Sequence, residues 1–248
     1  MLVYLINLDR SSARLHSMRE RFSELGIEFE RVPACDAQKL SAAEIDEFKS
    51  LRPFGIWKHV GKIGCFKSHF GLWEMVAQGN DRYTAIFEDD LHVSDDLPLF
   101  LTGRVPPVEA DIIRLETTKN RALFTGQAIS WNGRRLRRLN SSVSGNGAYI
   151  LSKEGAQKIL AYPTHKHLNG DLTLLCREQS ALARSLNTYQ VDPGLCIQDK
   201  VFHKDLSKTV FKSDIELHGE HIQSIPLRDR LVRAAYNTVR GYKRVQFR

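Results

Sequence analysis

The sequence is poor in the residues that mark several classes of protein. Its 248 residues include four cysteines, Cys35, Cys65, Cys176 and Cys196, and none of them forms a CxxC pair. Cysteines scattered in this way are most simply free thiols in a reducing compartment, and their spacing argues against a structural zinc site. No apolar run approaches the ~20 residues that a membrane-spanning helix needs.

The amino terminus lacks the basic leader of a signal peptide. Its apolar run, residues 1–6, is short and continues directly into Asn7 and Asp9. We therefore expect a first strand at this position and a cytoplasmic protein.

The body of the chain lacks an excess of positive charge, although the whole sequence carries +7. Residues 227–248 contain seven Lys or Arg and one Asp, so this segment holds +6 and residues 1–226 hold only +1. A nearly neutral body argues against nucleic acid as a partner.

The sequence does contain an alternation of strand-like and helix-like segments. Residues 2–8 form a β-rich apolar run, residues 12–25 place apolar side chains at helical spacing, and residues 27–32 alternate like a strand. This β-α-β opening favours an α/β fold. Further along, Asn132-Gly133 indicates a β-hairpin turn, and residues 171–186 have the pattern of one helix.

Three consecutive acids, Glu88, Asp89 and Asp90, follow directly after a strand predicted over residues 83–87. An isolated acidic run is more often a solvated turn. In an α/β sheet, however, ligands bind at the carboxyl ends of strands, and three adjacent carboxylates there need a counter-charge. A hard cation, Mg²⁺ or Mn²⁺, would supply it and bridge to a diphosphate.

Strand alternation separates the roles of these three acids. Glu88 and Asp90 share one face of an extended chain, so they are the expected metal ligands, with Asp90 favoured. Asp89 or Glu88 would then contact the nucleotide.

Four segments of the sequence, taken in order, match the pattern of one known protein family. They are residues 3–11 (VYLINLDRS), 61–69 (GKIGCFKSH), 85–90 (AIFEDD) and 147–152 (GAYILS). Together they resemble glycosyltransferase family 25, the bacterial lipopolysaccharide and lipooligosaccharide glycosyltransferases. Lys62 and Lys67 depart from the residues common in that family.

The resemblance implies a fold and an activity. The fold would be of the GT-A type, a Rossmann-like mixed sheet flanked by helices, and we expect it to occupy residues 1–226. The reaction would be an inverting transfer of galactose or glucose from a UDP-sugar to a lipid-linked oligosaccharide acceptor.

Five residues in or just after the matching segments are candidates for contacts with the nucleotide sugar. Asn7, Arg10 and Arg14 follow the first strand, where arginine suits phosphate; a solvated helix start is the alternative. Ser68 and His69 lie on the helix before the acidic strand. His69 would bond phosphate, a carboxylate or the sugar, or else be a satisfied structural histidine.

An inverting transfer also needs a base for the acceptor hydroxyl. The family pattern points to Asp171, which otherwise suits a helix cap, and Glu116 is the competing candidate. Many metal-dependent GT-A enzymes add a late histidine ligand, so His203 is the expected third ligand, with Gln198 and Asp199 as alternatives.

The basic tail, residues 227–248, has apolar residues up to Tyr242 close to one helical face. A basic amphipathic helix suits an anionic membrane surface, so we expect the tail to bring the protein to the inner face of the cell membrane. A helix packed on the body or in a dimer contact is the alternative.

Two other functions remain open from the sequence. A metal-dependent nucleotidyltransferase would also use an acidic site, but its usual glycine-rich loop is absent from residues 7–12. A non-catalytic module that binds carbohydrate or membrane is the third hypothesis.

Overall fold

The computed structural model describes residues 1–51, 59–102, 105–163, 170–203 and 242–248. In this part of the chain the main sheet has nine strands in the order β11-β6-β7-β9-β5-β8-β3-β1-β2. These strands are β1 (Leu2–Asn7), β2 (Glu30–Pro33), β3 (Tyr83–Glu88), β5 (Ile112–Arg114), β6 (Arg121–Trp131), β7 (Arg134–Leu139), β8 (Ala148–Ser152), β9 (Thr188–Asp192) and β11 (Tyr242–Arg244).

Parallel and antiparallel pairs are mixed in this sheet. β1 pairs in parallel with β2 and β3, and β5 pairs in parallel with β9, whereas β8 runs antiparallel between β3 and β5. A second, two-stranded sheet pairs β4 (Leu91–Val93) with β10 (Cys196–Gln198). The predicted mixed α/β sheet flanked by helices is confirmed.

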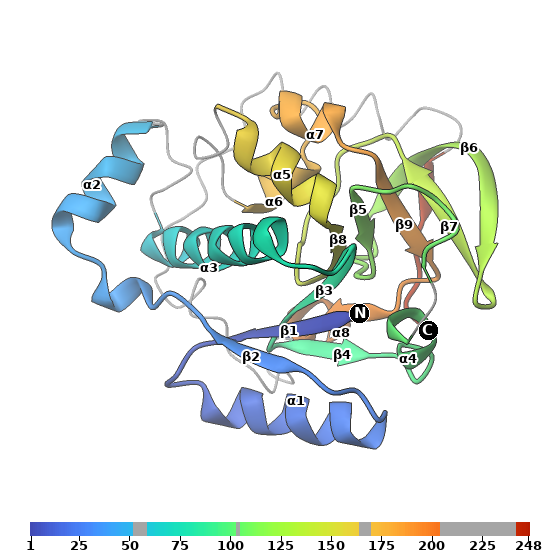
Figure 1. Ribbon diagram of the computed structural model, residues 1–248, viewed down its shortest axis with the longest axis horizontal. Helices are drawn as coiled ribbons and strands as arrows, with labels where there is room; N and C mark the ends of the chain where they lie inside the picture. Colours follow the sequence, from blue (N-terminus) through green and yellow to red (C-terminus); the bar gives the residue numbers. More distant parts are fainter. Residues whose placement is uncertain (52–58, 103–104, 164–169, 204–241) are drawn as a thin grey trace.

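Helices cover both faces of the sheet (Figure 1). Beside β1 and β2, α1 lies on one side and α3 on the other, and α5 packs against α3. The helices are α1 (Ser12–Glu24), α2 (Ala42–Leu51), α3 (Val60–Gln78), α4 (Pro98–Leu101), α5 (Lys153–Ala161), α6 (Gly170–Leu175), α7 (Ala181–Ser185) and α8 (Asp199–Phe202), with a 3-10 turn, η1 (Ala37–Lys39), before α2.

Alternate residues of the central strands supply two apolar cores. The α1 side contains Val3, Leu5, Met18, Phe22 and Phe87. The α3 side contains Tyr4, Ile6, Phe66, Trp73 and Ile86. Because successive strand residues point to opposite faces, a strand buried on both faces is apolar at nearly every position.

Strand direction brings several chain segments to one edge of the sheet. β1, β2, β3 and β5 run the same way, so their carboxyl ends share this edge. β8 runs the other way and therefore enters the sheet at the same edge, where the Glu88 amide donates to the Gly147 carbonyl at 2.7 Å. All four segments of the family resemblance thus converge here.

Two predictions of local structure had different outcomes. The hairpin is confirmed, because β6 and β7 are joined through Asn132 and Gly133, both with positive φ. The single helix over 171–186 is wrong, since α6 and α7 are separate. The Ser180 hydroxyl caps α7 at the Ala183 amide and donates to the Thr173 carbonyl, which ends the helical run.

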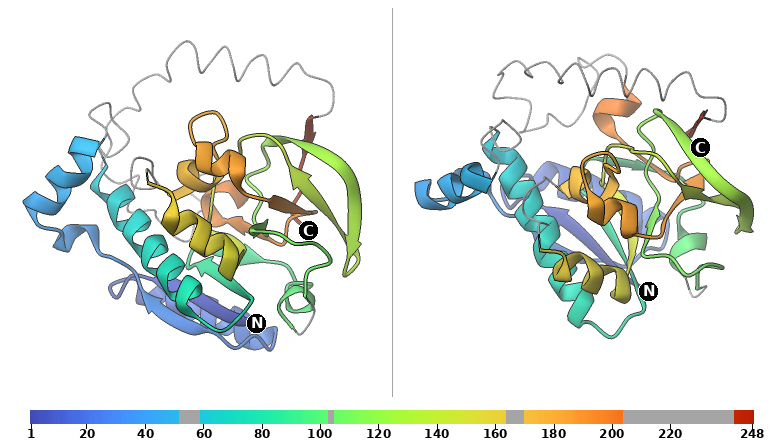
Figure 2. Two further views of the ribbon diagram at one scale, coloured as in Figure 1. Left: turned by 45° about the horizontal axis from the view of Figure 1, so that its top comes forward. Right: turned by 90° about the horizontal axis from the view of Figure 1, so that it is seen from above.

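The end of the chain differs from the expected helix. Tyr242–Arg244 form β11, which pairs antiparallel with β6 at the edge of the sheet (Figure 2). The placement of Tyr242 on a helical face is therefore wrong; the side chain is buried against the body, where strand pairing satisfies the backbone. Residues 227–241 of the predicted tail lie outside the described residues.

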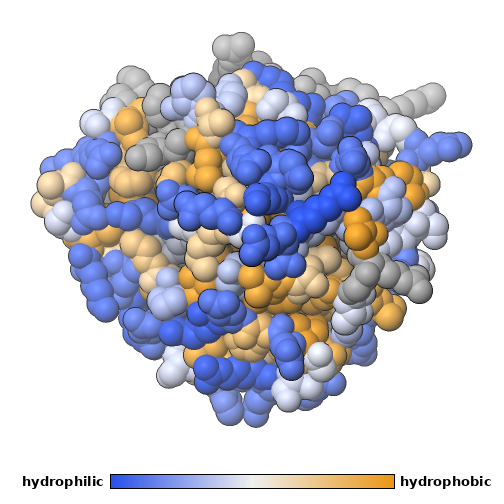
Figure 3. All heavy atoms as spheres, in the orientation of Figure 1, coloured by the Kyte–Doolittle hydropathy of each residue, from blue (hydrophilic) through white to orange (hydrophobic). Residues whose placement is uncertain are grey.

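The surface drawn in Figure 3 is covered mostly by hydrophilic side chains, with apolar groups between them. Within the described ranges, no helix combines the length and the apolar character required to cross a bilayer.

Candidate functional site

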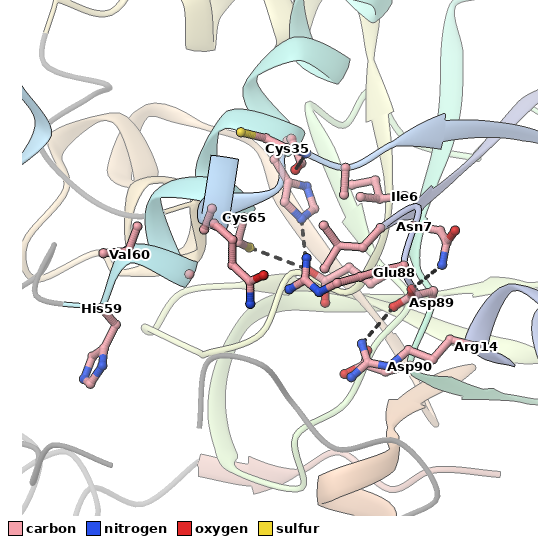
Figure 4. Close-up of a pocket in the computed structure, with 18 of the residues that line it drawn as sticks. Ile6, Asn7, Arg14, Cys35, His59, Val60, Cys65, Glu88, Asp89 and Asp90 are labelled. Atoms are coloured by element: carbon pink, nitrogen blue, oxygen red, sulfur yellow. Dashed lines mark hydrogen bonds and ion pairs between the residues drawn. The ribbon is translucent and has the colours of Figure 1, made fainter. Parts of the chain in front are cut away.

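A pocket of about 660 Å³ lies at the edge where the strands end. Its walls come from the end of β1, the segment after β2, α2, the first half of α3, the end of β3, and Gln198 and Lys200. Figure 4 shows Asp89, Asp90 and Arg14 at one end and His59 and Val60 at the other. The volume is in the range of small-molecule and cofactor sites.

The pocket has an apolar wall and several cationic side chains. The apolar wall includes Ala34, Leu40, Ile45 and Val60. The cationic residues are Arg10, Arg14 and Lys200. Such a combination can hold an aromatic base beside an anionic group.

Glu88 is held from both sides. Its Oε1 is 3.0 Å from His69 Nε2, and its Oε2 accepts from Gln198 Nε2 at 2.8 Å. Burial alone would raise the pKa of Glu88, but the hydrogen bond from His69 and the charge of Lys200 outweigh it, so this pKa lies below its ordinary value. Glu88 is therefore a carboxylate at neutral pH.

Asp89 is held by two of the predicted nucleotide contacts. Its Oδ2 accepts from Asn7 Nδ2 at 2.7 Å, and Arg14 Nη1 lies 3.1 Å from Oδ1. Burial raises the pKa of Asp89, although Arg14 and Asn7 act in the opposite direction. Asn7 is 1% exposed and also accepts from Arg31 Nε, so its amide mainly organises the end of β1.

Asp90 differs from its two neighbours because it is poorly satisfied. Among the described residues, its buried Oδ1 has no hydrogen-bond partner. Burial raises the pKa of this carboxyl to about 8, and the adjacent charge of Glu88 acts in the same direction. A buried carboxyl oxygen without a hydrogen bond costs free energy. Such an oxygen in a pocket indicates a group that interacts with a bound ligand.

The helix α3 positions Glu88 through a chain of buried hydrogen bonds. His69 Nδ1 lies 2.9 Å from the Tyr149 hydroxyl, which accepts from Trp73 Nε1 at 2.9 Å. Because an ionised carboxylate can only accept, His69 Nε2 donates to Glu88. His69 is 1% exposed, so it acts on Glu88 from within the core although one edge lines the pocket.

Ser68 and Gly64 set the distance between α3 and the pocket wall. The Ser68 hydroxyl donates to the Gly64 carbonyl and accepts from the Cys35 amide, both at 2.8 Å. A Cβ on Gly64 would lie 2.7 Å from the Cys35 carbonyl oxygen, so only glycine allows this approach. Arg10, the last of the five predicted contacts, lines the pocket and pairs with Asp36 at 2.6 Å.

Neither of the two candidate bases is among the residues that line the pocket. Glu116 is fully buried; its Oε2 accepts from the Gly147 amide at 2.7 Å, and within the described chain its Oε1 has no partner. Burial raises the pKa of Glu116 to about 7. Asp171 is partly exposed near the start of α6, and its charge acts on both Glu116 and Cys65.

The structure groups the predicted metal ligands differently from the sequence. Among the described residues, two clusters have metal-binding atoms within 4.8 Å of one another. One contains Cys65, His69 and Glu88; the other contains His92, Asp199 and His203. His203 is therefore placed with His92 and Asp199, and the predicted set of Glu88, Asp90 and His203 is neither cluster.

Several residues that line or support the pocket carry no sequence signal that would find them. Tyr149 lies in an apolar strand, and the wall after β2 is formed by small and apolar residues such as Ala34 and Leu40. Lys200 follows Gln198, which the sequence suggested only as an alternative ligand. These residues join the site because strands from distant parts of the chain end at the same edge.

The fold and the pocket define a class of protein. Acids, cations and an apolar wall meet outside the carboxyl ends of parallel strands, the place where α/β proteins bind their ligands. Within that class, the chain belongs to glycosyltransferase family 25, described as an LPS biosynthesis protein family, whose model matches residues 1–174.

Relatives of known name support this family. The chain is 26% identical over 225 residues to the lipooligosaccharide biosynthesis protein lic2B of Haemophilus influenzae, covering 88% of this chain and 80% of that one. It is 27% identical over 230 residues to the lacto-N-neotetraose biosynthesis glycosyltransferase LgtE of Neisseria gonorrhoeae, covering 88% and 81%.

Among solved structures, the inositol-1-phosphate CTP transferase from T. maritima aligns with a TM-score of 0.35 and 9% identity, over 79% of this chain and 68% of that one. No inference follows from a likeness this weak. Family membership makes the chain a glycosyltransferase, with a sugar donor and an oligosaccharide acceptor, and disfavours the nucleotidyltransferase and the non-catalytic module.

Proposed function

We propose that this glycosyltransferase moves a hexose, galactose or glucose, from a UDP-sugar to a lipopolysaccharide or lipooligosaccharide acceptor with inversion at the anomeric carbon. One observation carries the proposal: in the pocket of a family 25 member, the buried Asp90 Oδ1 has no hydrogen-bond partner in the described chain. A divalent cation held together with the donor's diphosphate would supply the partner that this oxygen lacks.

The pocket suits the two halves of a UDP-sugar. Its apolar wall, which includes Leu40 and Ile45, would receive the base and ribose. Arg10 and Arg14 would face the diphosphate, since guanidinium groups match phosphate oxygens. Ser68 shapes this wall, His69 holds Glu88, and Asn7 fixes Asp89.

The acids fit a hard divalent cation, Mn²⁺ or Mg²⁺. Asp90 would be the principal ligand because its Oδ1 is unsatisfied, and Glu88 would be the second because its pKa is low. Oxygen donors of this kind are what these cations prefer. When bound, the cation would act as a Lewis acid toward the charge that develops on the leaving diphosphate.

The acceptor hydroxyl needs a base, and we assign this role to Asp171. It is partly exposed, so an acceptor could reach it, whereas Glu116 is fully buried and holds the Gly147 amide. Asp171 would take the acceptor proton as the hydroxyl oxygen attacks the anomeric carbon and the bond to the diphosphate breaks. Glu116 remains the competing base.

We also propose that the basic tail brings the protein to the inner face of the cell membrane, where a lipid-linked acceptor would be available. The support is its charge, +6 over residues 227–248. Deleting the tail would remove β11 as well. Replacing Arg228, Arg230 and Arg233 with Gln is a cleaner test: vesicle binding at low salt should fall, and undiminished binding would refute the tail model.

A donor panel tests the central proposal. The protein is incubated with several UDP-hexoses, Mn²⁺ and an oligosaccharide acceptor, and UDP release and the anomeric configuration of the product are measured. We expect UDP release that EDTA abolishes and added Mn²⁺ restores. Full turnover in EDTA would refute the cation, and pyrophosphate release would point instead to nucleotidyl transfer.

A further inference from the structure

Two histidines and an aspartate meet beside the pocket but outside its lining. His92 Nε2 lies 2.7 Å from Asp199 Oδ1, and His203 Nε2 lies 3.5 Å from the same oxygen. All three binding atoms are within 4.8 Å of one another. Both imidazoles therefore converge on one carboxylate oxygen.

Backbone pairing holds these residues in register. β4 and β10 pair antiparallel with Ile197 opposite His92, and the Asp199 amide donates to the Asp90 carbonyl at 2.8 Å. α8 then brings His203 one turn beyond Asp199, with its amide donating to the Asp199 carbonyl at 3.0 Å. β4, β10 and α8 pack together, so the three side chains are carried by one local unit.

The orientation of the His92 ring is fixed by an aromatic contact. Its centroid lies 4.3 Å from that of Phe202, with an interplanar angle of 28°. The Asp199 side chain is only 1% exposed, whereas those of His92 and His203 are 31% and 25% exposed. The cluster is thus anchored at the buried acid and open to solvent at the imidazoles.

The geometry points to a site for Zn²⁺ or a similar divalent transition metal, formed by His92, Asp199 and His203. This site is separate from the candidate cation site at Glu88 and Asp90. Zinc binds nitrogen and carboxylate ligands at about 2.0–2.2 Å in tetrahedral geometry, which separates ligand atoms by roughly 3.3–3.6 Å. The observed 2.7 and 3.5 Å need only a small adjustment. Three protein ligands leave a fourth position for water.

The donor atoms separate this site from the one that serves the sugar donor. Imidazole nitrogen suits Zn²⁺, Co²⁺ and Ni²⁺, while an all-oxygen site suits Mg²⁺ and Mn²⁺. A metal here joins β4 to α8, and α8 begins directly after Gln198 and contains Lys200, both in the pocket wall. A metal at this site would therefore hold one wall of the pocket in place.

Zinc titration of the metal-stripped full chain, without nucleotide, tests this site independently of the transfer reaction. We expect one Zn²⁺ per chain by calorimetry, and His92→Gln and His203→Gln should each weaken binding by about tenfold or more. His16→Gln, on the exposed face of α1, and Cys65→Ser, in the other cluster, should bind like the wild type.

Two further measurements keep the test decisive if a histidine variant is unstable. Zinc should raise the melting temperature of the wild type and of His16→Gln but not of the His92 or His203 variants. Bound Co²⁺ should give visible ligand-field bands without a thiolate charge-transfer band, because the site contains no sulfur.

The possible outcomes separate the explanations. Unchanged zinc affinity in both histidine variants would overturn the site, and the His92–Asp199 contact would then be an ordinary hydrogen bond. Loss of binding in Cys65→Ser, or a thiolate band with Co²⁺, would also overturn it by placing the metal beside Glu88. UDP-sugar turnover can fail or succeed without changing either result.

Discussion

Two glutamates, the half-buried Glu88 at the end of β3 and the fully buried Glu116 after β5, lie on either side of Gly147. A Cβ on Gly147 would lie 3.2 Å from Glu88 Oε2 and 3.3 Å from Glu116 Oε2, so the two carboxyls share one glycine as their boundary. Glu88 has a lowered pKa, whereas burial raises the pKa of Glu116 to about 7. Desolvation acts to raise the pKa of both groups, yet the net shifts are opposite.

The difference lies in the partners. Glu88 accepts from His69 and Gln198 and opens onto the pocket. Glu116 accepts one backbone amide, and its second oxygen lacks a partner among the described residues. Desolvation therefore does not decide the charge of a carboxyl by itself; the hydrogen-bond donors and charges that the surrounding elements bring to it also act. We therefore propose that the end of β3 receives a charged ligand and that the end of β5 has a supporting role.

The sharpest test of this contrast replaces one acid at each strand end. Asp90→Asn should lower kcat by about 1,000-fold or more, because a lost Lewis-acid contact is worth several kcal/mol. Glu116→Gln, the matched change at the β5 end, should lower kcat by less than about tenfold. Steady-state kinetics with the best donor measures both, and comparable rates for Asp90→Asn and the wild type would remove the functional distinction.

The second test asks which acid serves as the base. Asp171→Asn should lower kcat by about 100-fold or more with little effect on donor affinity, since proton transfer contributes only during the reaction. If Glu116→Gln shows these effects and Asp171→Asn does not, the base lies at the β5 end and the contrast between the two ends is reversed.

The third test uses the pH dependence of stability. The folded Glu116 keeps a proton up to about pH 7, while the unfolded chain releases it near 4.5. The folded state then binds more protons, so the free energy of unfolding falls as pH rises through this window, by at most about 3 kcal/mol.

Glu116→Gln should remove that decline, as measured by urea unfolding from pH 4 to 8. Glu88→Gln is the comparison: the lowered pKa of Glu88 contributes stability above about pH 4.5 that is lost as pH falls, so this variant should change the slope in the opposite direction. Equal slopes in both variants would contradict the assigned charge states.

The smallest expected effect comes from loosening the support of Glu88. Tyr149→Phe removes the hydroxyl that joins His69 and Trp73 and should destabilise the protein by about 1–3 kcal/mol. Tyr83→Phe, which removes a hydroxyl donating to Val108 at 3.4 Å, is the control and should change stability less. Thermal unfolding measures both, and equal losses would show that the His69 network has no special role.

Local sequence patterns were enough to predict several elements of the fold. The β1–α1–β2 opening, the strand before Glu88 and the hairpin at Asn132-Gly133 follow from periodicity and turn chemistry within a few residues. The strands β4, β10 and β11 were not predicted, because each has three residues and is defined by pairing with a distant segment. α6 and α7 were merged for lack of a local sign of the Ser180 contacts.

The same limit applies to the candidate site. Residue type and order pointed to the acidic run, to the family and to Asn7, Arg14 and His69 as contacts of the nucleotide sugar. They could not show that Asn7 is buried behind Asp89, or that His203 lies with His92 instead of Asp90. Those facts depend on where β1, β4 and α8 lie in space.

The sequence by itself determined the class of fold, the family and the position of three acids at the end of a buried strand. The tertiary structure alone decided what each acid is: Glu88 charged and held, Asp89 paired, Asp90 left with an unpartnered oxygen among the described residues. The physical reason is that pKa and hydrogen bonding depend on desolvation and on donors within a few ångströms. Here those donors come from residues up to 110 positions away in the chain.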